Sequence, residues 1–273
     1  MPEGPEMYRV ARQVEKRVAQ APLTELWFAF PELNRRAKAL HGQPIVSVRT
    51  LGKALLIEFE SGHTVYTHNQ LYGRWLFSSP ERRPDTRRQL RLAISTSRHS
   101  ALLYSASDIH LINPGKLSAH PFVQGAGLDV LSSGAAPEEI ERWISKAQFS
   151  GRRLGHLLLD QSFLAGVGNY LRSEILFVAR LNPGARLRDL DDAQRKRLAE
   201  AVHQLMWRSV KTGGVTNDPE RVAELRAAGW NRRDYRHFVF GRDGQACFES
   251  GAAIVKKTIA GRRLYLSPGL QSE

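Results

Sequence analysis

Residues 157–177 read LLLDQSFLAGVGNYLRSEILF, and this stretch decides the fold of the second half of the chain. Apolar residues at helical spacing flank the glycine-rich sequence AGVGN, which predicts a helix, a tight turn and a second helix. Backbone N–H groups at the start of the second helix form a ready phosphate site, and Asn169 is placed there to cap the helix or to donate to a phosphate. Glu174 is expected to face inward. Glycine is common in helix–turn–helix connections, so the motif alone does not identify a function.

The two halves of the chain differ in their patterns, and the composition changes near residues 113–135, where Pro, Gly and Ser cluster. The second half is mostly helical, whereas the first half has the short alternating segments typical of strands. The first half is predicted as a helix over 3–20, strands over 45–50, 54–60, 63–68, 74–78, 90–96 and 101–106, and a mobile loop over 82–88. The second half is predicted as helices over 137–146, 151–160, 169–179 and 191–210, a loop with one short helical piece over 211–236, and strands within 237–270.

The chain is strongly basic, with 40 Lys and Arg against 27 Asp and Glu and a formal net charge of +13. Such a balance favours a polyanionic partner, and charge alone leaves DNA, RNA and an anionic membrane open. No single amphipathic helix collects the basic residues, which disfavours a membrane surface, and no apolar run reaches the ~20 residues that cross a bilayer. The terminus lacks the pattern of a secretory signal, so a soluble intracellular protein is expected.

The terminal sequence MPEGPE places an unusual candidate nucleophile at the start of the chain. Met1 is usually removed before a small residue, which leaves Pro2 with a free secondary amine whose ordinary pKa is about 8. Such an amine can attack a sugar C1′ and form an iminium ion that acidifies the C2′ hydrogen, as lysine does in Schiff-base enzymes. Glu3 is placed to move protons to the leaving group. On these two residues alone a simple helix start is the better explanation, but Gly4 and Pro5 behind them favour a fixed terminus.

Two further segments carry residues with chemical potential, and each has a plain structural alternative. Lys53 follows a glycine at the start of a strand, where it can hold a phosphate or donate a proton, although a solvent-exposed hairpin lysine is the commoner case. Residues 68–75 read HNQLYGRW and place Gln70, Leu71 and Tyr72 at a turn between strands. An apolar residue and an aromatic displayed at a turn can wedge into a base stack when a nucleotide is extruded. A core Leu and Tyr at a hairpin is the alternative.

These segments occur in the order found in one enzyme family. The chain contains, one after another, MPEGPE, GKALL, HNQLYG, YSASDI, HPF, LLLDQSFLAGVGNYLRSEIL and FGRDGQACFESG…PG. Over nearly its whole length it thus resembles the formamidopyrimidine-DNA glycosylase and endonuclease VIII superfamily, the helix–two-turn–helix glycosylases, and HNQLYG and YSASDI favour the endonuclease VIII branch. Members remove oxidised bases, mainly pyrimidines in this branch, and nick the strand by β,δ-elimination, leaving phosphate on both sides of the gap.

The resemblance implies a role for each candidate residue. Pro2 matches the Schiff-base nucleophile, Glu3 the general acid/base and Lys53 the lysine credited with β-elimination. The DNA-contacting positions are Gln70, Leu71 and Tyr72, which fill the void left by the extruded nucleotide, and Asn169, which binds a phosphate in the two-turn motif.

The C-terminal segment departs from the family. Relatives carry four cysteines in this finger, whereas this chain keeps Cys247 and has Ser250, Ser267 and Leu270 at the other positions. Zinc is therefore expected to be absent, giving a zincless finger in which apolar packing replaces coordination. The finger arginine that the family ties to δ-elimination is retained as Arg262, and that packing alone must position it.

The resemblance and the patterns together predict an α+β fold in three domains. Residues 1–125 form an N-terminal catalytic helix and antiparallel β-sandwich, and residues 126–236 form a helical DNA-binding domain with the helix–two-turn–helix motif. Residues 237–273 form the zincless-finger β-hairpin. Gly125 lies where relatives typically carry a DNA-contacting arginine, so that contact is lost or supplied by a neighbour.

The expected function is that of a bifunctional DNA glycosylase and AP lyase in base-excision repair. It is expected to need no cofactor, to bind damaged DNA as a monomer without membrane contact, and to work in the cytoplasm, at the nucleoid when bound to DNA. A catalytically silent damaged-DNA-binding protein on the same scaffold is the alternative, but a binder has no use for Pro2, Glu3 and Lys53 together. A structural RNA-binding protein is disfavoured by the β-sandwich half and the PEGPE terminus.

Overall fold

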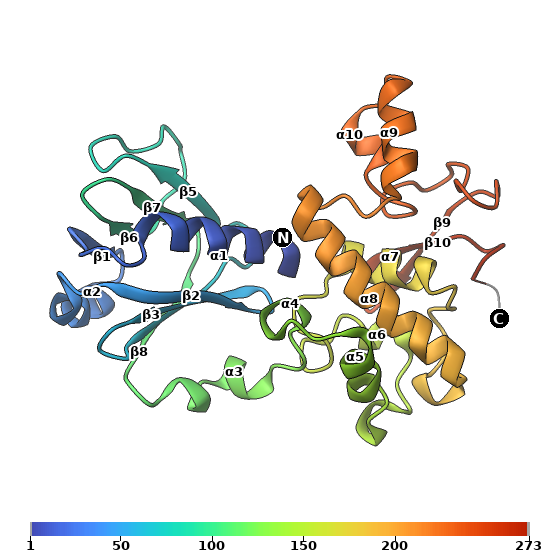
Figure 1. The fold of residues 1–273 in the computed structure, drawn as a ribbon, viewed down its shortest axis with the longest axis horizontal. Helices are drawn as coiled ribbons and strands as arrows, with labels where there is room; N and C mark the ends of the chain where they lie inside the picture. The colour runs from blue at the N-terminus through green and yellow to red at the C-terminus, as the bar shows by residue number, and fades with distance from the viewer. Residues whose placement is uncertain (1, 272–273) are drawn as a thin grey trace. The chain divides into compact units, whose positions relative to one another are not determined.

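Helix α1, Gly4–Val18, begins directly behind Pro2 and Glu3 in the computed structural model, which describes residues 2–271 (Figure 1). Its start follows from the sequence, because Pro5 tolerates the first turn, where its missing N–H is not needed, and the acidic Glu6 complements the helix dipole. The apolar residues recur at helical spacing and lie on one buried face: Met7, Ala11, Val14 and Val18. The helix therefore packs against the strands that follow it, and it contacts β2 most extensively among them.

Eight antiparallel strands follow in two four-stranded sheets. One sheet has the order β1-β6-β7-β5, from Glu25–Phe28, Leu90–Ser95, Ser100–Tyr104 and Arg74–Ser78. The other has the order β2-β3-β4-β8, from Ile45–Leu51, Ala54–Phe59, Thr64–His68 and Asp108–Ile112. Short helices complete this part of the chain: α2 (Pro31–Ala37), the 3-10 turns Lys38–Leu40 and Leu117–Ala119, and α3 (Pro121–Gly125). The six predicted strands are confirmed, but β1 and β8 were missed because such short segments show little periodicity without their partners.

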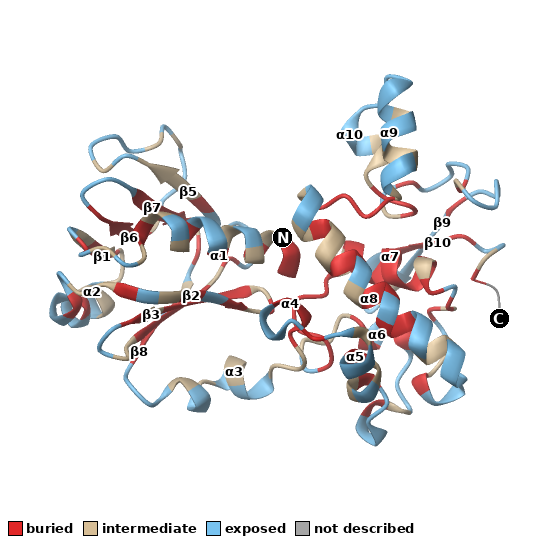
Figure 2. Cartoon of the chain, viewed as in Figure 1, coloured by how far each residue is buried: buried red, intermediate tan, exposed pale blue. Residues whose placement is uncertain are grey.

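The two sheets form a sandwich around one apolar core, which also takes in α1 (Figure 2). Strand β3 shows how the sequence builds it. Leu55 and Ile57 point into this core, while Leu56 between them joins a smaller cluster with Tyr66 and Ile112. Burying a side chain of this size contributes about 1.5–3 kcal/mol, so both faces of β3 hold it in place. Lys53 directly precedes β3, so its backbone position is fixed by the packing of this strand.

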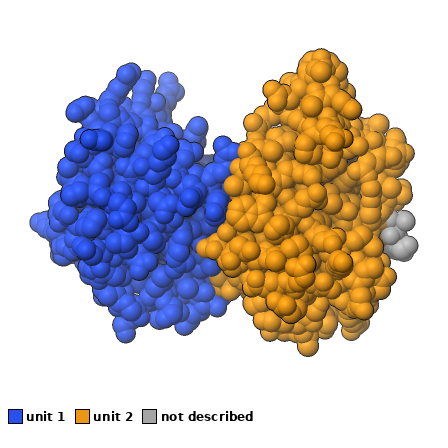
Figure 3. All heavy atoms as spheres, in the orientation of Figure 1, with its two compact units in different colours: residues 1–125 blue, residues 126–273 orange. Residues whose placement is uncertain are grey.

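The chain divides into two compact units, residues 1–125 and residues 126–273 (Figure 3). The second unit is mostly helical and ends in the β9–β10 hairpin, which confirms the α+β class. Its long helix α8, Asp192–Thr212, packs against α5, Pro137–Ile144, and against α7, Asn169–Val178. The remaining elements are α4 (Val130–Ser133), α6 (Leu154–Leu157), α9 (Pro219–Ala227), α10 (Arg232–Tyr235), β9 (Val255–Ile259), β10 (Arg262–Leu266) and the 3-10 turns Ala147–Phe149 and Leu187–Asp189.

Three predictions for the second unit are wrong. The helix expected over 151–160 is only the single turn α6, because the N–H groups of Leu154 and Gly155 donate to carbonyls of residues 185 and 183 instead. The segment 211–236 contains two helices, α9 and α10, rather than one piece. The strands expected across 237–270 are confined to β9 and β10, since backbone N–H groups near the start of that segment bond to a buried carboxylate.

Candidate active site

The N-terminal residues are fixed by the first turn of α1. Glu6 Oε2 accepts a hydrogen bond from the Glu3 N–H at 2.9 Å, and the Met7 N–H donates to the Glu3 carbonyl at 3.1 Å. Pro2 is half-buried directly before this capped turn, and Glu3 is only 5% exposed. A secondary amine next to a buried carboxyl group is suited to nucleophilic attack with local proton transfer.

Lys53 lies in the two-residue turn between β2 and β3. Gly52 takes φ 58° in this turn, a conformation that glycine adopts without strain. The pairing of Ala54 with His68 brings His68, at the end of β4, to the same edge of the sheet. Burial lowers the pKa of His68, Asp108 opposes that shift, and Lys53 lowers the pKa further. The charge of Lys53 is therefore close enough to influence His68, the last residue before the turn that follows β4.

That turn, residues 69–73, is called the wedge turn below, and it connects a strand of one sheet to a strand of the other. The Gly73 N–H donates to the Asn69 carbonyl at 2.7 Å, and a Cβ on Gly73 would come within 2.4 Å of the same oxygen. Leu71 and Tyr72 project from the turn and are 57% and 68% exposed. They are not core residues, so the hairpin-core alternative is wrong, and an apolar pair stands ready to enter a base stack.

Side chains outside the wedge turn anchor it. Gln70 takes a positive φ of 52°, which is uncommon for a residue other than glycine and needs such support. The contacts are His68 Nδ1, which accepts the Gln70 N–H at 3.1 Å, Ser107 Oγ, which donates to Gln70 Oε1 at 2.9 Å, and Arg88, which donates to the Tyr72 carbonyl at 2.7 Å. These hydrogen bonds therefore fix the backbone conformation of the wedge turn.

In the second unit, Asn169 is the first residue of α7 and Gly168 is its N-cap, so the expectation that Asn169 caps the helix is wrong. The Arg172 guanidinium donates to Asn169 Oδ1 at 2.8 Å. A guanidinium can only donate, so the amide oxygen of Asn169 faces Arg172 and the amide NH₂ group is turned the other way. This orientation offers a hydrogen-bond donor of the kind that contacts DNA phosphates.

Arg262 is the first residue of β10, directly after the two-residue turn of the β9–β10 hairpin. Ala260 and Gly261 form that turn with positive φ values of 55° and 67°, the pattern of a type I′ turn. Arg262 is exposed, so a cation stands beside the tip of the hairpin. Such a group can form charge-assisted hydrogen bonds with phosphate.

Glu174 is fully buried on α7, which confirms that it faces inward. Its carboxylate accepts hydrogen bonds from the N–H groups of Phe238 at 2.8 Å, Val239 at 2.9 Å and Phe240 at 2.9 Å, and from the Thr216 hydroxyl. Burial raises the pKa of Glu174, and these hydrogen bonds oppose the shift. The carboxylate ties the segment that enters the finger to the helix that carries Asn169.

Three of the family's four cysteine positions, Cys247, Ser250 and Ser267, form a polar cluster in this chain. Ser250 Oγ and Ser267 Oγ lie 3.0 Å apart, and both bond to the Cys247 thiol. Burial raises the pKa of that thiol, but these hydrogen bonds bring it below its ordinary value. Hydrogen bonds, rather than only the expected apolar packing, therefore join three of the four positions. Within residues 2–271, no group of three or more His, Cys, Asp or Glu side chains is arranged to hold a metal ion.

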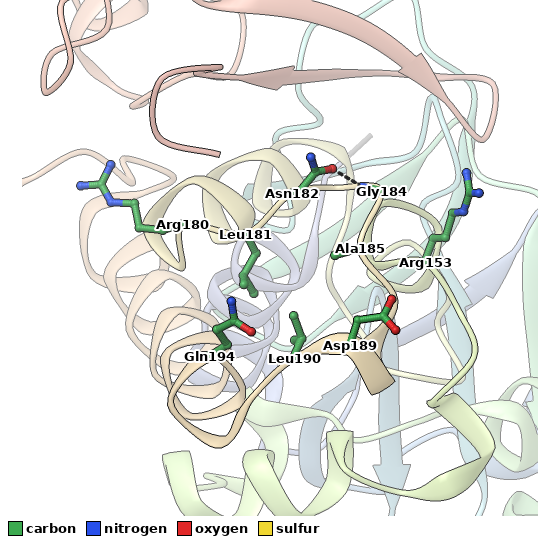
Figure 4. Close-up of a pocket in the computed structure, with 9 residues that line it drawn as sticks. All are labelled: Arg153, Arg180, Leu181, Asn182, Gly184, Ala185, Asp189, Leu190 and Gln194. Carbon is green, nitrogen blue, oxygen red and sulfur yellow. Dashed lines mark hydrogen bonds between the residues drawn. The ribbon is translucent and has the colours of Figure 1, made fainter. Parts of the chain in front are cut away.

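A pocket of about 490 Å³ lies elsewhere in the second unit, near the start of α8 (Figure 4). Arg153 and Arg180 stand on opposite sides of it, and Asp189 brings a negative charge to the same lining. The Gly184 N–H donates to Asn182 Oδ1 at 2.6 Å on its rim. No candidate site residue lines this pocket, so we assign it no part in the chemistry.

Two family profiles match this chain. The N-terminal domain of formamidopyrimidine-DNA glycosylase matches residues 1–107, and the H2TH domain of the same family matches residues 127–220. Endonuclease 8 of Escherichia coli is 41% identical over 271 residues, which cover 99% of this chain and 100% of the relative, and endonuclease 8 of Shigella flexneri matches to the same extent. The chain belongs to the formamidopyrimidine-DNA glycosylase family. It is a DNA glycosylase with AP lyase activity in base-excision repair, which favours the enzyme over the DNA-binding and RNA-binding alternatives.

Solved structures share the fold of this glycosylase. Lactococcus lactis formamidopyrimidine-DNA glycosylase bound to DNA with an abasic site has a TM-score of 0.79 and 18% identity, covering 99% of this chain and 100% of that one. The L. lactis enzyme in complex with DNA containing an oxidised pyrimidine has a TM-score of 0.79 and 19% identity, covering 100% of both chains. No helix within residues 2–271 is long and apolar enough to cross a membrane.

Several residues around the candidate site of this glycosylase were missed by sequence reasoning. Arg172 had a visible signal, since it is a lone basic residue within the apolar run of α7. His68 and Ser107 lie within the family segments HNQLYG and YSASDI, but their contacts depend on the meeting of distant strands. Arg88 had no local signal, because it is one of many arginines in an exposed loop.

The buried side chain of His237 predicts that the free energy of unfolding depends on pH. Burial lowers the pKa of His237 well below its ordinary value of 6.5, and Arg236 and Arg232 lower it further. Below pH 6.5 the histidine is protonated in the unfolded chain but stays neutral in the folded chain. Its contribution to the free energy of unfolding is therefore fully present above that pH and is lost as the pH falls. Between about pH 7.5 and 5.5 this histidine is expected to remove about 1.4 kcal/mol from the free energy of unfolding.

Urea unfolding at the two pH values measures this loss, with His237→Gln as the control variant. The variant is expected to lose less stability on acidification than the wild type by about the same amount, about 1.4 kcal/mol. An equal pH dependence in the two proteins would show that the pKa of His237 is the same in the folded and unfolded states, and would contradict the prediction.

Proposed function

We propose that this glycosylase uses Pro2 as its nucleophile once Met1 is removed. The amine attacks C1′ of the damaged nucleotide, and the C1′–N bond breaks as the base leaves with the electron pair and a proton from Glu3. The sugar ring then opens, O4′ takes a proton, and an iminium forms between C1′ and the Pro2 nitrogen. The observation that carries the proposal is the half-buried Pro2 on a capped helix start, directly followed by the buried Glu3.

Two cations are proposed to assist the eliminations that follow. Removal of a C2′ proton expels the 3′ phosphate, and a second elimination expels the 5′ phosphate, so that phosphate remains on both sides of the gap. Lys53 is proposed to serve the first step and Arg262 the second. Support comes from the fixed turn that carries Lys53 and from the exposure of Arg262 beside the hairpin tip.

We propose that the substrate is damaged DNA and that oxidised pyrimidines are the main lesions. The net charge of +13 favours DNA binding, and the NH₂ group of Asn169 is oriented as a phosphate donor. Gln70, Leu71 and Tyr72 would fill the void left by the extruded nucleotide. The enzyme would act as a monomer in the bacterial cytoplasm, at the nucleoid when bound to DNA, as its bacterial relatives indicate.

Borohydride trapping tests the proposed chemistry. Reduction of the iminium is expected to join the protein covalently to DNA that contains an oxidised pyrimidine or an abasic site. Peptide mass spectrometry should then find the added mass on the N-terminal peptide that begins with Pro2. An adduct on any lysine instead of Pro2, or no adduct with active wild-type protein, would refute the assignment.

The wedge turn supports a prediction about duplex DNA. The double variant Leu71→Ala, Tyr72→Ala is expected to lower excision from a base-paired duplex by about ten- to a hundredfold, because nothing then replaces the stacking of the extruded base. Cleavage of a single strand with a preformed abasic site should change little, since no base needs to be displaced. Val46→Ala, at a 40% exposed position on β2, is the control. Equal losses on both substrates would point to a general defect rather than to a wedge.

The finger is proposed to work without zinc, with hydrogen bonds among Cys247, Ser250 and Ser267 in place of coordination. Elemental analysis of the purified protein is expected to find far less than one zinc per chain, and chelators should leave the activity unchanged. The triple variant Ser250→Cys, Ser267→Cys, Leu270→Cys is the matched control, because four thiolates complete a tetrahedral site and should retain one zinc. Stoichiometric zinc in the wild type would overturn the proposal.

The finger, residues 237–273, and the helical part, residues 126–236, are proposed as separate functional domains within the second unit. One contributes Arg262 and the other contributes Asn169. The DNA contact that relatives place at Gly125 is proposed to come from a neighbouring residue, and a Cβ added at Gly125 would meet no atom within 4 Å.

A further inference from the structure

A short antiparallel bridge in the second unit brings two arginines together: Arg153, just before α6, lies directly opposite Arg186, between α7 and α8. The N–H groups of Leu154 and Leu187 donate across this bridge at 2.9 and 3.2 Å, each one residue beyond an arginine. That pattern makes the arginines a non-hydrogen-bonded pair, whose Cβ atoms lie on one face about 4.5–5.5 Å apart. The two side chains, called the bridge pair below, therefore start side by side.

The acids around the bridge pair are engaged by other arginines. Arg152 Nη1 lies 2.6 Å from Asp160 Oδ2, and Arg188 Nε lies 3.7 Å from Asp189 Oδ1. The other oxygen of Asp189 accepts a backbone N–H at 3.1 Å, and Arg153 is directed away from this carboxylate (Figure 4). Within residues 2–271, neither member of the bridge pair forms an ion pair. Like charges directly opposite each other on paired strands are destabilising, so this arrangement favours an anionic ligand.

The bridge pair lies close to the proposed phosphate-binding amide. Gly155 follows Arg153 by two residues, a span of at most about 7 Å. The Arg172 guanidinium donates to the Gly155 carbonyl and to Asn169 Oδ1, both at 2.8 Å. It also donates to the Arg263 carbonyl of the β9–β10 hairpin at 3.1 Å. The segment of the bridge, the start of α7 and the hairpin therefore meet at one guanidinium.

A phosphate group matches the charge and the geometry of the bridge pair. Its oxygens accept paired N–H bonds from a guanidinium fork, and such charge-assisted bonds are about twice as strong as neutral ones. Arg153 is exposed and Arg186 is half-buried, so both can reach a ligand in solvent. The DNA substrate of this glycosylase carries one phosphate per nucleotide, and successive nucleotides of a strand rise by about 3.4 Å. A strand bound at Asn169 therefore offers further phosphates at the distance of the bridge pair.

We propose that the bridge pair is a second phosphate-binding site for the DNA backbone, a few nucleotides from the phosphate at Asn169. The inference deepens the proposed function, because it rests on the proposed path of the DNA past Asn169. Arg153 and Arg186 hold the strand and take no part in breaking bonds. Their contribution is binding that is equal in the ground state and in the transition state.

Equilibrium binding tests the proposal on a duplex that carries an uncleavable tetrahydrofuran abasic site. The double variant Arg153→Gln, Arg186→Gln is expected to bind this duplex about tenfold more weakly at low salt, measured by fluorescence anisotropy. The slope of log affinity against log salt concentration should become less steep by about 1, since each phosphate contact contributes about 0.9 to it. Excision at saturating protein should stay within about twofold of the wild type, because the chemical step is unaffected.

A methylphosphonate scan locates the contact. Each phosphate of the duplex is replaced in turn by a neutral methylphosphonate, and the loss of affinity is measured for every position. The wild type should lose affinity at a position where the double variant loses nothing further, because that contact is already absent. Asn169→Ala should remove the loss at a different position, which marks the phosphate of the proposed function.

The matched control is Arg12→Gln, Arg35→Gln, which removes the same charge from two exposed arginines that pair with glutamates one helical turn away. Because salt screens such distant charges, this control should change the affinity by less than about twofold and leave the scan unaltered. Arg153→Lys, Arg186→Lys keeps both charges and should retain the affinity within about threefold. The melting temperature of the double glutamine variant without DNA should not fall, because the substitutions remove a repulsion.

The outcomes separate the inference from the proposed function. If the double glutamine variant binds as tightly as the wild type, or keeps the wild-type scan, the bridge pair holds no phosphate and the inference alone is wrong. A large fall in its melting temperature with an unaltered scan would show that the pair only supports the fold. If Asn169→Ala leaves the scan unchanged while the double variant removes one position, the proposed role of Asn169 is wrong and the bridge-pair site is confirmed. If neither alters the scan, the DNA does not pass this face and both are wrong.

Discussion

Chains in which the Pro2 nitrogen is acylated, either by retained Met1 or by an N-terminal tag, are expected to lose base excision and the borohydride adduct by about a thousandfold or more. An amide nitrogen has no available lone pair, so it cannot attack C1′. The rest of the site should be intact, because the first turn of α1 is closed by the Glu3 N–H bond to Glu6. Gel assays of excision and trapping on the same oligonucleotide measure both effects.

A tag of the same sequence at the C-terminus is the matched control, and it should leave activity unchanged. Pro2→Gly is expected to lose most of the adduct as well, although a primary amine remains. A secondary amine gives an iminium that is cationic at every pH, whereas the imine from a primary amine must first be protonated. Full activity in the N-terminally tagged protein would exclude Pro2 as the nucleophile.

Glu174→Ala is expected to lower the free energy of unfolding of the second unit by about 3–5 kcal/mol. The variant leaves the buried N–H groups of Phe238, Val239 and Phe240 without their acceptor. Each unsatisfied buried donor costs about 1–3 kcal/mol, and water entering the cavity would offset part of the sum. Urea unfolding followed by circular dichroism measures the loss.

Glu200→Ala, which removes an exposed carboxylate from α8, is the control for the change in charge and should shift stability by less than about 0.5 kcal/mol. Glu174→Gln keeps one acceptor oxygen and should fall between the wild type and the alanine variant. A loss below about 1 kcal/mol in Glu174→Ala would mean that the segment 237–240 finds other acceptors, and that the carboxylate does not hold the finger.

Much of the fold could be predicted because its signals are local. Helix α1 has a Pro and an acid at its start and a regular apolar face, so its extent followed from the sequence within a few residues. Strands with alternating residues, such as β3, were also predicted. The predictions failed where hydrogen bonds to distant residues replaced local ones. Helix α6 is one turn because the N–H groups of Leu154 and Gly155 bond elsewhere, and residues 238–240 form no strand because Glu174 accepts their N–H groups.

The candidate site shows the same division. Pro2, Glu3 and Asn169 lie in contiguous motifs, so the sequence and its family resemblance were enough to nominate them. The roles of Arg88 and Arg172 depend on acceptors far away in the chain, such as the carbonyls of Tyr72 and Arg263. No local pattern marks a carbonyl as a partner, since every residue has one.

By itself, the sequence determined the α+β class, the chemistry available at the terminus and the glycine-rich entry to α7, because capping, turn formation and amphipathic periodicity act between neighbouring residues. Only the tertiary structure decided how the wedge turn is anchored and what ties the hairpin to α7. Those outcomes depend on hydrogen bonds between residues distant in the chain, and such bonds exist only after the sheets and helices have packed.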